Sequence, residues 1–440
     1  MKSSQLNEKI KWASSKFIEL SRRKDIFLVT HFDTDGISSA AIMVQTLRKL
    51  DKKFSLKIIK SLEEEFINKI PRDKLVIFLD LASASLHHIK KAGLKDVFII
   101  DHHEVFQEIP KEVTLLNSWF EGKKRICSAG LVYLFCNELI SDNSFSKLAV
   151  LGMIGDMMEE DIGELGDDIF RKGEIKKIKG LKMYPSTKPL NKVLEYSSSP
   201  YIAGVSGNSR GVIELLRNAG IEPINGRYKS LIELSDTEME KLVTLIALKN
   251  PLLNYKSLIG DIFLLKFFNK LEDAREISAM INACSRLGES YTALKFCLEL
   301  PDSKRRVEEI YGEYKKHLIS ALEFVSTLEK IEGEDFVIIN AQKNIKDTII
   351  GTIATILSTS SLYREGTVIT AMAHYENKIK ISMRICGNEN NGKNAREILE
   401  RVIKEIGGEY GGHEHAAGGV ISLDKEEAFI ETLKKSLEIK

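Results

Sequence analysis

Continuous apolar runs and amphipathic stretches alternate along the first third of the chain. The runs at 25–30, 74–80 and 96–100 are too uniformly apolar for strands with one exposed face, which predicts strands buried within a parallel sheet. Helical patterns follow the first two of these runs, at 38–53 and 83–93. The alternation of strand and helix predicts an α/β fold with a doubly wound parallel sheet at the N-terminal end.

The pattern changes twice in the rest of the chain. Residues 145–158 are predicted to form a buried helix, and 190–325 to be mostly helical, with apolar periodicity at 211–219, 236–248, 273–287 and 304–328. From about 334 strands and helices mix again, and a segment with six glycines in 13 residues follows at 407–419. We therefore expect three regions: an α/β domain, a helical connecting region and a smaller mixed α/β domain, over 1–190, 191–325 and 326–440.

Composition narrows the class of protein. The 440 residues are 43% hydrophobic and 29% charged, as in ordinary soluble domains. No apolar run approaches the roughly 20 residues of a membrane helix, and the first residues lack a signal-peptide pattern. The five cysteines are scattered without CxxC spacing, which favours reduced thiols in a cytoplasm over a zinc ribbon or disulfides. With a net charge of +1, any nucleic-acid surface must be a local basic patch.

Acidic and histidine side chains gather where the predicted strands end. "HFDTDG" (31–36) follows the first strand, Asp80 the second and "DHH" (101–103) the third, while Asp156 lies in the predicted buried helix. His31, Asp33 and Asp35 alternate along the chain, so in an extended segment they share one face. Gly36 would then permit a sharp turn into the next helix.

Each acid also has an ordinary structural interpretation. An aspartate after a strand is often only a helix N-cap, and Asp156 could be a paired acid within the core. Three clusters at the carboxyl ends of three parallel strands, where α/β sheets place their ligand sites, favour a functional site instead. Carboxylate and imidazole ligands without cysteine favour manganese or magnesium over zinc or copper. Two such ions about 4 Å apart, sharing one carboxylate, would use all these ligands and could activate a water molecule against phosphorus, as in a two-metal phosphoesterase.

The same residues resemble a known family. "HFDTDG", Asp80 in "FLDLAS", "DHH" and "GDMM" are similar, in order, to four motifs of the DHH phosphoesterase superfamily. "GGHEHAAGG" (411–419) resembles the signature of the companion DHHA1 domain, and "INACSRLG" (281–288) resembles a segment of RecJ-type single-strand nucleases. The resemblance spans nearly the whole chain, and its length and helical middle are most similar to the archaeal RecJ-like nucleases.

The resemblance implies a role for each residue of the clusters. It implies one ion held by His31, Asp33 and Asp80, and a second held by four residues that again include Asp80: Asp35, Asp80, His102 and Asp156. Asp80 would thus be shared, and Mn²⁺ is the first expectation with Mg²⁺ as the alternative. His103 would face the scissile phosphate, and Asp101 would orient a neighbouring histidine, so that Asp80, His103 and Asp101 form the catalytic set.

The resemblance also implies contacts to substrate phosphates. The candidates are two arginines, a serine, a histidine and four glycines: Arg286, Arg384, Ser382, His413, Gly411, Gly412, Gly418 and Gly419. The family's usual "AGR" is "CSR" here, and His415 is an addition to the pattern. A helix-surface ion pair is the alternative for Arg286. A basic run at 171–182 is either a solvated face or a track for a nucleic-acid strand.

These residues predict a hydrolase of phosphodiester bonds. We expect a metal-dependent exonuclease acting on single-stranded DNA or RNA in replication or repair, with its cleft between the DHH and DHHA1 domains. The alternatives are a hydrolase of oligoribonucleotides or cyclic dinucleotides, and a replisome scaffold, although the complete ligand set disfavours a dead enzyme. The resemblance implies the GINS complex or a repair helicase as protein partners, and we expect no membrane contact.

Overall fold

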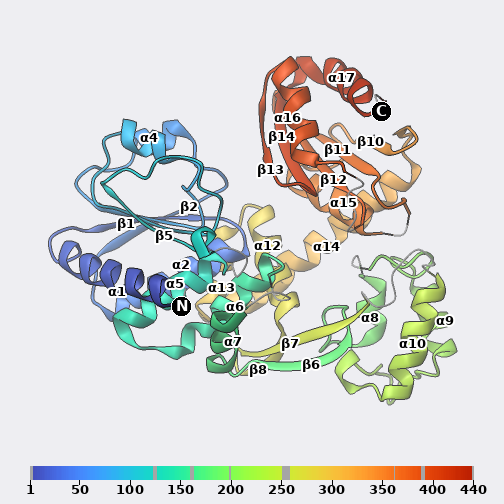
Figure 1. The fold of residues 1–440 in the computed structure, drawn as a ribbon. Helices are drawn as coiled ribbons and strands as arrows, with labels where there is room; N and C mark the ends of the chain where they lie inside the picture. The colour runs from blue at the N-terminus through green and yellow to red at the C-terminus, as the bar shows by residue number, and fades with distance from the viewer. Residues whose placement is uncertain are drawn as a thin grey trace. The chain divides into compact units, whose positions relative to one another are not determined.

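The computed structural model describes residues 3–121, 126–158, 163–197, 200–249, 258–360, 362–387 and 392–438 (Figure 1). The chain forms two compact units, each made of two separate segments of the sequence. The first unit contains residues 1–178 and 262–311, and the second contains 179–261 and 312–440.

A five-stranded parallel sheet forms the centre of the first unit. Its strands have the order β2–β1–β3–β4–β5, with bounds β1 (Ile26–His31), β2 (Phe54–Ile59), β3 (Leu75–Leu79), β4 (Val97–Asp101) and β5 (Val113–Asn117). The three strands predicted from apolar runs are confirmed as β1, β3 and β4. The strand order reverses between β1 and β3, because β2 lies on one side of β1 and the later strands are added on the other. Sheets of this kind bind their ligands at such a point.

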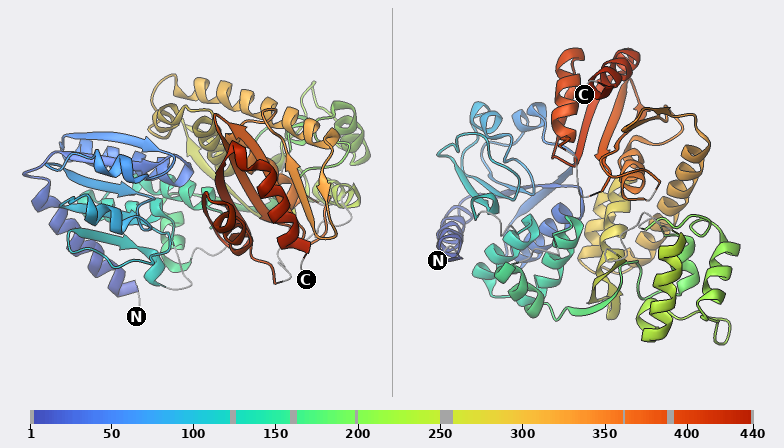
Figure 2. Two further views of the ribbon diagram at one scale, coloured as in Figure 1. Left: turned by 90° about the horizontal axis from the view of Figure 1, so that it is seen from above. Right: turned by 45° about the vertical axis from the view of Figure 1, so that its right-hand side comes forward.

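Helices cover both faces of this sheet, which confirms the doubly wound arrangement (Figures 1 and 2). On one face Phe78 and Ile99 pack with α3 (Glu64–Asn68) and α4 (Leu86–Lys91). Phe98 points to the other face, where its ring lies 6.0 Å from that of Phe17. The helices on that side of the sheet are α1 (Ser3–Leu20), α2 (Thr34–Lys49), α5 (Ser128–Ile140), α6 (Ser146–Gly155) and α7 (Gly163–Lys172).

The middle of the chain is helical, as predicted, but it also contains a small sheet that we did not predict. The four periodic stretches correspond to four of the helices that follow: α8 (Leu190–Glu195), α9 (Ser209–Asn218), α10 (Asp236–Lys249), α12 (Ala274–Arg286), α13 (Ser290–Cys297) and α14 (Ser303–Thr327). This three-stranded sheet has the strand order β6–β7–β8, with bounds β6 (Lys176–Leu181), β7 (Ile259–Phe267) and β8 (Lys270–Asp273). Short 3₁₀ turns are η1 (Ser118–Glu121), η2 (Asn143–Phe145), η3 (Leu231–Glu233) and η4 (Leu423–Lys425).

A six-stranded mixed sheet dominates the end of the second unit, as predicted. Its order is β13–β14–β12–β11–β10–β9, with bounds β9 (Ile331–Glu332), β10 (Phe336–Asn340), β11 (Val368–Tyr375), β12 (Lys378–Ile385), β13 (Glu409–Gly412) and β14 (Ala416–Ser422). Ile381 and Met383 of β12 pack with α16 (Ala395–Ile406) and α17 (Glu426–Glu438). The side chain between them, that of Ser382, points to the opposite face, which α15 (Asp347–Thr359) covers.

Two further findings bear on the class of protein. All five cysteines are buried and unpaired, in agreement with reduced thiols. Among the helices of the described residues, none combines the length and apolar character that a membrane crossing requires.

Candidate metal centre

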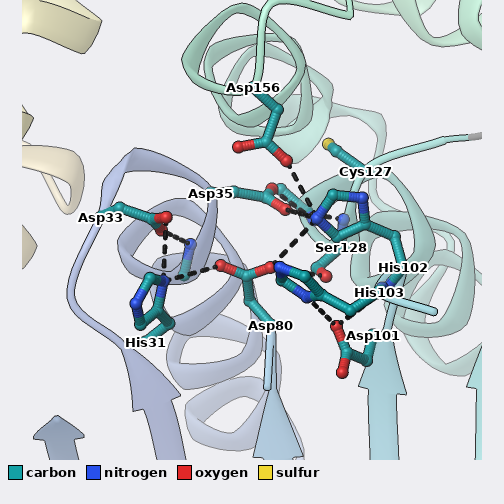
Figure 3. Close-up of polar contacts among 12 residues, drawn as sticks. His31, Asp33, Asp35, Asp80, Asp101, His102, His103, Cys127, Ser128 and Asp156 are labelled. Carbon is teal, nitrogen blue, oxygen red and sulfur yellow. Dashed lines mark hydrogen bonds and ion pairs between the residues drawn. The ribbon is translucent and has the colours of Figure 1, made fainter. Parts of the chain in front are cut away.

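The acidic and histidine clusters predicted from the sequence come together at the carboxyl edge of the five-stranded sheet (Figure 3). Two aspartates follow β1, one follows β3, another ends β4, and Asp156 comes from the end of α6. Asp156 is the C-cap of that helix, which ends at Gly155, so the prediction of a helix running on to 158 was wrong. This position leaves the carboxylate at a helix end, where it can point into the cluster.

The turn after β1 holds its acids by close packing. Asp33 is the N-cap of α2, since its side chain accepts a hydrogen bond of 3.0 Å from the backbone N–H of Gly36. A Cβ on Gly36 would lie 2.4 Å from the carbonyl oxygen of His31. The glycine is therefore required by this close approach, and α2 begins at Thr34 rather than at residue 38 as predicted. The capping and ligand interpretations of Asp33 are compatible.

Asp80 lies at the middle of the cluster (Figure 3). Its Oδ2 is 3.4 Å from Nδ1 of His31, and its Oδ1 is 3.5 Å from Nε2 of His102. The side chain is almost completely buried, and the backbone has a φ of +60°, which is uncommon for a residue other than glycine. Such backbone strain is concentrated at functional sites, and here it directs a buried carboxylate between two groups of candidate ligands.

Two groups of side chains lie on either side of Asp80. In the first, Nδ1 of His31 is 2.9 Å from Oδ2 of Asp33. In the second, Nε2 of His102 is 3.1 Å from Oδ2 of Asp156, and Asp35 is the third member. One potential ligand atom from each residue lies within 4.8 Å of the others in the sets His31–Asp33–Asp80, Asp35–His102–Asp156 and Asp80–His102–His103.

The buried polar atoms of the cluster fit a divalent cation. Nδ1 of His31, Oδ2 of Asp80 and Oδ2 of Asp156 are buried, and each lies within 3.4 Å of another side chain of the cluster. Adjacent buried carboxylates repel each other unless a positive charge lies between them. Oxygen and imidazole ligands suit Mn²⁺ or Mg²⁺, so the residues present fit the ions that the sequence predicted.

Two carboxylates of the cluster, those of Asp35 and Asp80, resist ionisation. Burial, followed by the charge of Asp156, raises the pKa of Asp35 to about 7. Burial, followed by the charges of Asp33 and Asp35, raises the pKa of Asp80 well above its ordinary value. A bound cation would reverse both effects, because it stabilises the ionised carboxylates.

The pKa values of two histidines of the cluster, His102 and His31, are raised as well. Burial alone would lower the pKa of His102, but its contact with Asp156 and the charge of Asp35 raise that pKa to about 9. Burial also opposes protonation of His31, but its contact with Asp33 and the charges of Asp156 and Asp101 together raise the pKa of this histidine. Both shifts follow from the negative charge of the neighbouring carboxylates, which a bound cation would also balance.

Asp101 organises the paired histidines that follow it. Its carboxylate accepts hydrogen bonds from the backbone N–H groups of Ser83 (3.0 Å), His102 (2.8 Å) and His103 (3.2 Å). The same carboxylate lies 2.7 Å from Nδ1 of His103, so His103 is the neighbour that Asp101 orients. The side chain of His102 is 17% exposed and that of His103 is 45% exposed. His102 therefore points into the cluster, and His103 points toward solvent.

The structure also reveals supporting residues that the sequence analysis missed. Asn117, at the end of β5, donates from its side chain to the hydroxyl of Ser83 (3.0 Å) and to the carbonyl of His103 (2.9 Å). An asparagine that closes the apolar run "VTLLN" was the available signal, because it ends a fourth strand at the same edge. These contacts fix the chain on both sides of the Asp101 carboxylate.

Helix α12 supports the turn between Asp33 and Asp35. The backbone N–H of Thr34 donates to the side chain of Asn282 (3.1 Å), and the Thr34 hydroxyl donates to the carbonyl of Ser278 (3.0 Å). The segment "INACSRLG" thus contacts the cluster through its asparagine. Arg286 is the last residue of the same helix and is partly exposed there.

The candidate phosphate-contacting residues of the second unit divide between two faces of its sheet. Ser382 pairs with Gly418 across β12 and β14, and Arg384 donates from Nε to the hydroxyl of Thr355 on α15 (3.0 Å). Gly419 faces the other way, since a Cβ there would lie 2.6 Å from a side-chain atom of Ile403 on α16. The remaining candidates lie in β13 or in the turn after it: Gly411, Gly412 and the exposed His413.

The basic run at 171–182 spans the end of α7 and β6. Arg171 and Lys172 both form ion pairs with Asp168, and Nζ of Lys179 lies 2.7 Å from the carboxylate of Asp261. Acidic partners therefore neutralise part of the run, which favours a solvated face over a track for nucleic acid.

Three family descriptions match successive parts of the chain. The "DHH family, N-terminal domain" matches residues 25–155, the "DHH-CID domain" matches 184–251 and the "DHHA1 domain" matches 334–438. The first range contains most of the cluster, up to the residue before Asp156.

Relatives of known sequence agree with these matches. An uncharacterized protein of Methanocaldococcus jannaschii is 30% identical over 426 residues, which cover 92% of this chain and 91% of that protein. The single-stranded-DNA-specific exonuclease RecJ of Bacillus subtilis is 26% identical over 156 residues, but these cover only 32% of this chain and 20% of RecJ.

Solved structures show the same fold. A crystal structure of exonuclease RecJ bound to manganese has a TM-score of 0.63 at 16% identity and covers 98% of this chain and 95% of that one. The crystal structure of CDC45 from Entamoeba histolytica has a TM-score of 0.68 at 13% identity and covers 97% and 99%.

Proposed function

This chain belongs to the DHH/DHHA1 phosphoesterase superfamily and is RecJ-like, and on that premise we propose that it is a metal-dependent exonuclease of single-stranded DNA or RNA. The observation that carries the proposal is the position of Asp80, a buried carboxylate shared by two sets of side chains that could each hold an ion. Two adjacent divalent ions are the usual means of phosphodiester hydrolysis.

We assign the ion ligands as the sequence predicted them. His31, Asp33 and Asp80 would hold one Mn²⁺, and a set that again includes Asp80 would hold the other: Asp35, Asp80, His102 and Asp156. When bound, the ions would supply positive charge at the phosphate oxygens and lower the pKa of a water molecule. The protein's contribution is rigidity, because the ligands extend from strand ends and helix termini rather than from a mobile loop.

His103 and Asp101 act on the substrate in this proposal. Burial would lower the pKa of His103, but its contact with Asp101 raises that pKa and so favours the protonated ring. With Nδ1 directed at Asp101, the other ring nitrogen can donate a hydrogen bond to a phosphate oxygen. The carboxylate of Asp101 stays ionised, because the hydrogen bonds and charges of its neighbours outweigh burial and lower its pKa. Asp101 thus positions His103 while His103 touches the substrate.

Residues of the DHHA1 domain would bind phosphates without taking part in the chemistry. Arg384 offers a guanidinium, Ser382 a hydroxyl, and the glycines of β13 and β14 offer backbone N–H groups, as the resemblance implied. The division at residues 190 and 325 remains our proposal for three functional regions.

The substrate class is tested by a time course with Mn²⁺ on single strands of DNA and RNA, each labelled at either end. A nuclease of long strands should shorten them progressively from one end and should act on them faster than on a dinucleotide. A hydrolase of oligoribonucleotides or cyclic dinucleotides would show the reverse order of rates. Loss of the label from one end with no shortening of the strand labelled at the other end, or activity that persists in EDTA, would contradict the proposal.

A second candidate function is a structural role in replication, favoured by the similarity of the whole fold to CDC45. Such a role would require a partner, for which the GINS complex or a repair helicase is our proposal. Capture of the same partner from native extracts by wild-type protein and by an Asp80→Asn variant would support it. A scaffold that also degrades nucleic acid would pass both tests, whereas failure to capture either partner would remove this candidate.

A further inference from the structure

Ser128, the first residue of α5, touches the middle of the metal cluster although no sequence motif pointed to it. We propose that Ser128 is a positioning residue whose hydroxyl holds the shared carboxylate of Asp80 and thereby sets the affinity of the site for a second divalent ion. This inference rests on the proposed function, because it assumes that Asp80 contacts both ions.

The hydroxyl of Ser128 donates a hydrogen bond of 2.9 Å to Oδ1 of Asp80. Ser128 is fully buried and Asp80 is 2% exposed, so water does not compete for this contact. Oδ1 is also the oxygen that faces His102, whereas Oδ2 faces His31 and makes no hydrogen bond among the described residues. Ser128 therefore fixes one oxygen of Asp80 and leaves the other free for a cation.

This asymmetry determines how the carboxylate can be shared. A carboxylate bound at neither oxygen can rotate about its terminal bond, which has a broad torsional preference. With Oδ1 held by Ser128, Asp80 keeps one oxygen on the His102 side and the other on the His31 side. We infer that without the hydroxyl the first ion could draw Asp80 toward itself and leave the second position short of a ligand.

Ser128 can hold Asp80 because α5 is itself held. Cys127 occupies the N-cap of this helix but makes no side-chain capping bond. Asp35 takes that role instead, since its two oxygens accept the backbone N–H groups of Ser128 and Ala129, each at 2.8 Å. The backbone of Ser128 thus donates to Asp35 and its side chain donates to Asp80, and both aspartates are proposed ligands.

The packing behind this contact leaves little room for movement. A Cβ on Gly152 of α6 would lie 2.4 Å from Oδ1 of Asp35 and 2.5 Å from Cβ of Ala129. Helix α6 therefore packs in direct contact with the first turn of α5 and with the Asp35 carboxylate. The hydroxyl of Ser128 starts from a fixed backbone, which is what a residue that orients a metal ligand requires.

Several buried hydroxyls in the same unit donate to backbone carbonyls. Ser146, for example, is fully buried at the start of α6 and donates to the backbone carbonyl of Asn143 at 2.6 Å. Ser128 instead donates to a carboxylate of the metal cluster. Ser146 is thus a matched control for the loss of a buried serine hydroxyl near the start of a helix.

The test compares Ser128→Ala, Ser128→Thr and Ser146→Ala with the wild-type full chain. Calorimetric titration with Mn²⁺ measures the affinity of each ion, and thermal unfolding in EDTA measures the stability of the metal-free fold. We expect Ser128→Ala to bind the first Mn²⁺ normally and the second about 10- to 100-fold more weakly, the range found when the partner of a ligand is removed. Its hydrolysis should recover at high Mn²⁺, and Ser128→Thr, which keeps the hydroxyl, should bind both ions nearly as the wild type does.

Each outcome decides the inference. If Ser128→Ala binds each of the two ions as tightly as the wild type does, the inference is overturned, while the proposed function stays intact. Weak binding of the second ion by Ser146→Ala as well would also overturn it, because the effect would then be general. If Ser128→Ala unfolds, the Ser128→Thr variant decides, and a weakened second ion there contradicts a role for the hydroxyl. Wild-type protein without Mn²⁺-dependent hydrolysis would instead refute the proposed function.

Discussion

The two candidate regions of this molecule are built in opposite ways. At the carboxyl edge of the five-stranded sheet, three of the carboxylates are buried: Asp35 and Asp101 are fully inaccessible and Asp80 is almost so. On the mixed sheet of the second unit, the candidates are glycine backbone, an exposed histidine and Arg384, whose guanidinium already donates to Thr355. The first region concentrates negative charge away from water, and the second offers donors to an anion.

This difference separates two kinds of effect. Buried carboxylates couple metal binding to stability and to pH, because an ion removes the repulsion between them. Exposed donors do not affect the stability of the fold in this way and act only on a ligand that carries phosphate. Variants of the first region should therefore change metal binding and turnover, and variants of the second should change only substrate binding.

The largest effect is expected at the shared carboxylate. Asp80→Asn should reduce hydrolysis by at least about 10³-fold, because it removes a charge that both ions require. Asp35→Ala should be equally inactive and should remain folded. The initial rate on labelled single strands measures the loss.

Asp96→Asn is the matched control for Asp80→Asn. Both aspartates have a left-handed backbone, with φ of 54° at Asp96, but Asp96 forms an ion pair with Lys24 instead of joining the cluster. This control should retain wild-type activity. Normal turnover by Asp80→Asn would make the metal assignment untenable.

The paired histidines should differ from each other. His102→Ala should weaken Mn²⁺ binding by about 10- to 100-fold, since it removes a ligand. His103→Ala should bind Mn²⁺ normally but slow turnover by about 10²-fold, because it removes a donor to the phosphate. Calorimetry and single-turnover rates on the same preparations distinguish the two, and equal loss of metal from both would show that the division of roles is wrong.

A smaller effect is expected in the DHHA1 domain. Arg384→Ala should raise KM by about tenfold with little change in kcat, because a charge-assisted hydrogen bond contributes about 1.5–3 kcal/mol. Its Mn²⁺ affinity should equal that of the wild type. Arg401→Ala, on the exposed surface of α16, is the control and should leave KM unchanged. A change in metal affinity on loss of Arg384 would contradict the separation of the two regions.

The smallest effect concerns the stability of the metal-free protein between pH 5 and about 8.5. The pKa of Asp35 is raised to about 7, above the roughly 3.9 of an unfolded aspartate, and that of His102 is raised to about 9. Groups with raised pKa values stabilise the fold when protonated, so their contribution is lost as pH rises through those values. The unfolding temperature in EDTA should therefore fall by a few degrees over this range.

Divalent ions should cancel that trend, because the ionised ligands bind them more tightly as pH rises. Thermal unfolding in Mg²⁺ and in EDTA at each pH measures the difference. A metal-free protein that gains stability toward pH 8.5, or an equal slope with and without the ion, would contradict the account of the buried cluster.

The cluster could be predicted from the sequence because its residues follow strands directly. The spacing of His31, Asp33 and Asp35 and the apolar runs before Asp80 and Asp101 are local patterns, and parallel strands bring their carboxyl ends to one edge. The resemblance to the DHH and DHHA1 motifs added the pairing of residues with ions.

The supporting contacts could not be predicted in this way, because they join distant parts of the chain. Ser128 and Asp80 are 48 residues apart, and Thr34 and Asn282 are 248 residues apart. The hairpin of β7 and β8 was missed for a local reason. Its turn residues, Phe268 and Asn269, both have positive φ, but they lack the Asn-Gly pair that normally signals such a turn.

The central claim is that one buried carboxylate joins two ion positions, and calorimetric titration of the metal-free wild type and of Asp80→Asn with Mn²⁺ tests it most directly. We predict two Mn²⁺ per wild-type chain and at most one tightly bound ion in the variant, with both proteins folded before titration. A wild type that binds no Mn²⁺, or an Asp80→Asn variant that still binds two with wild-type affinity, would contradict the claim.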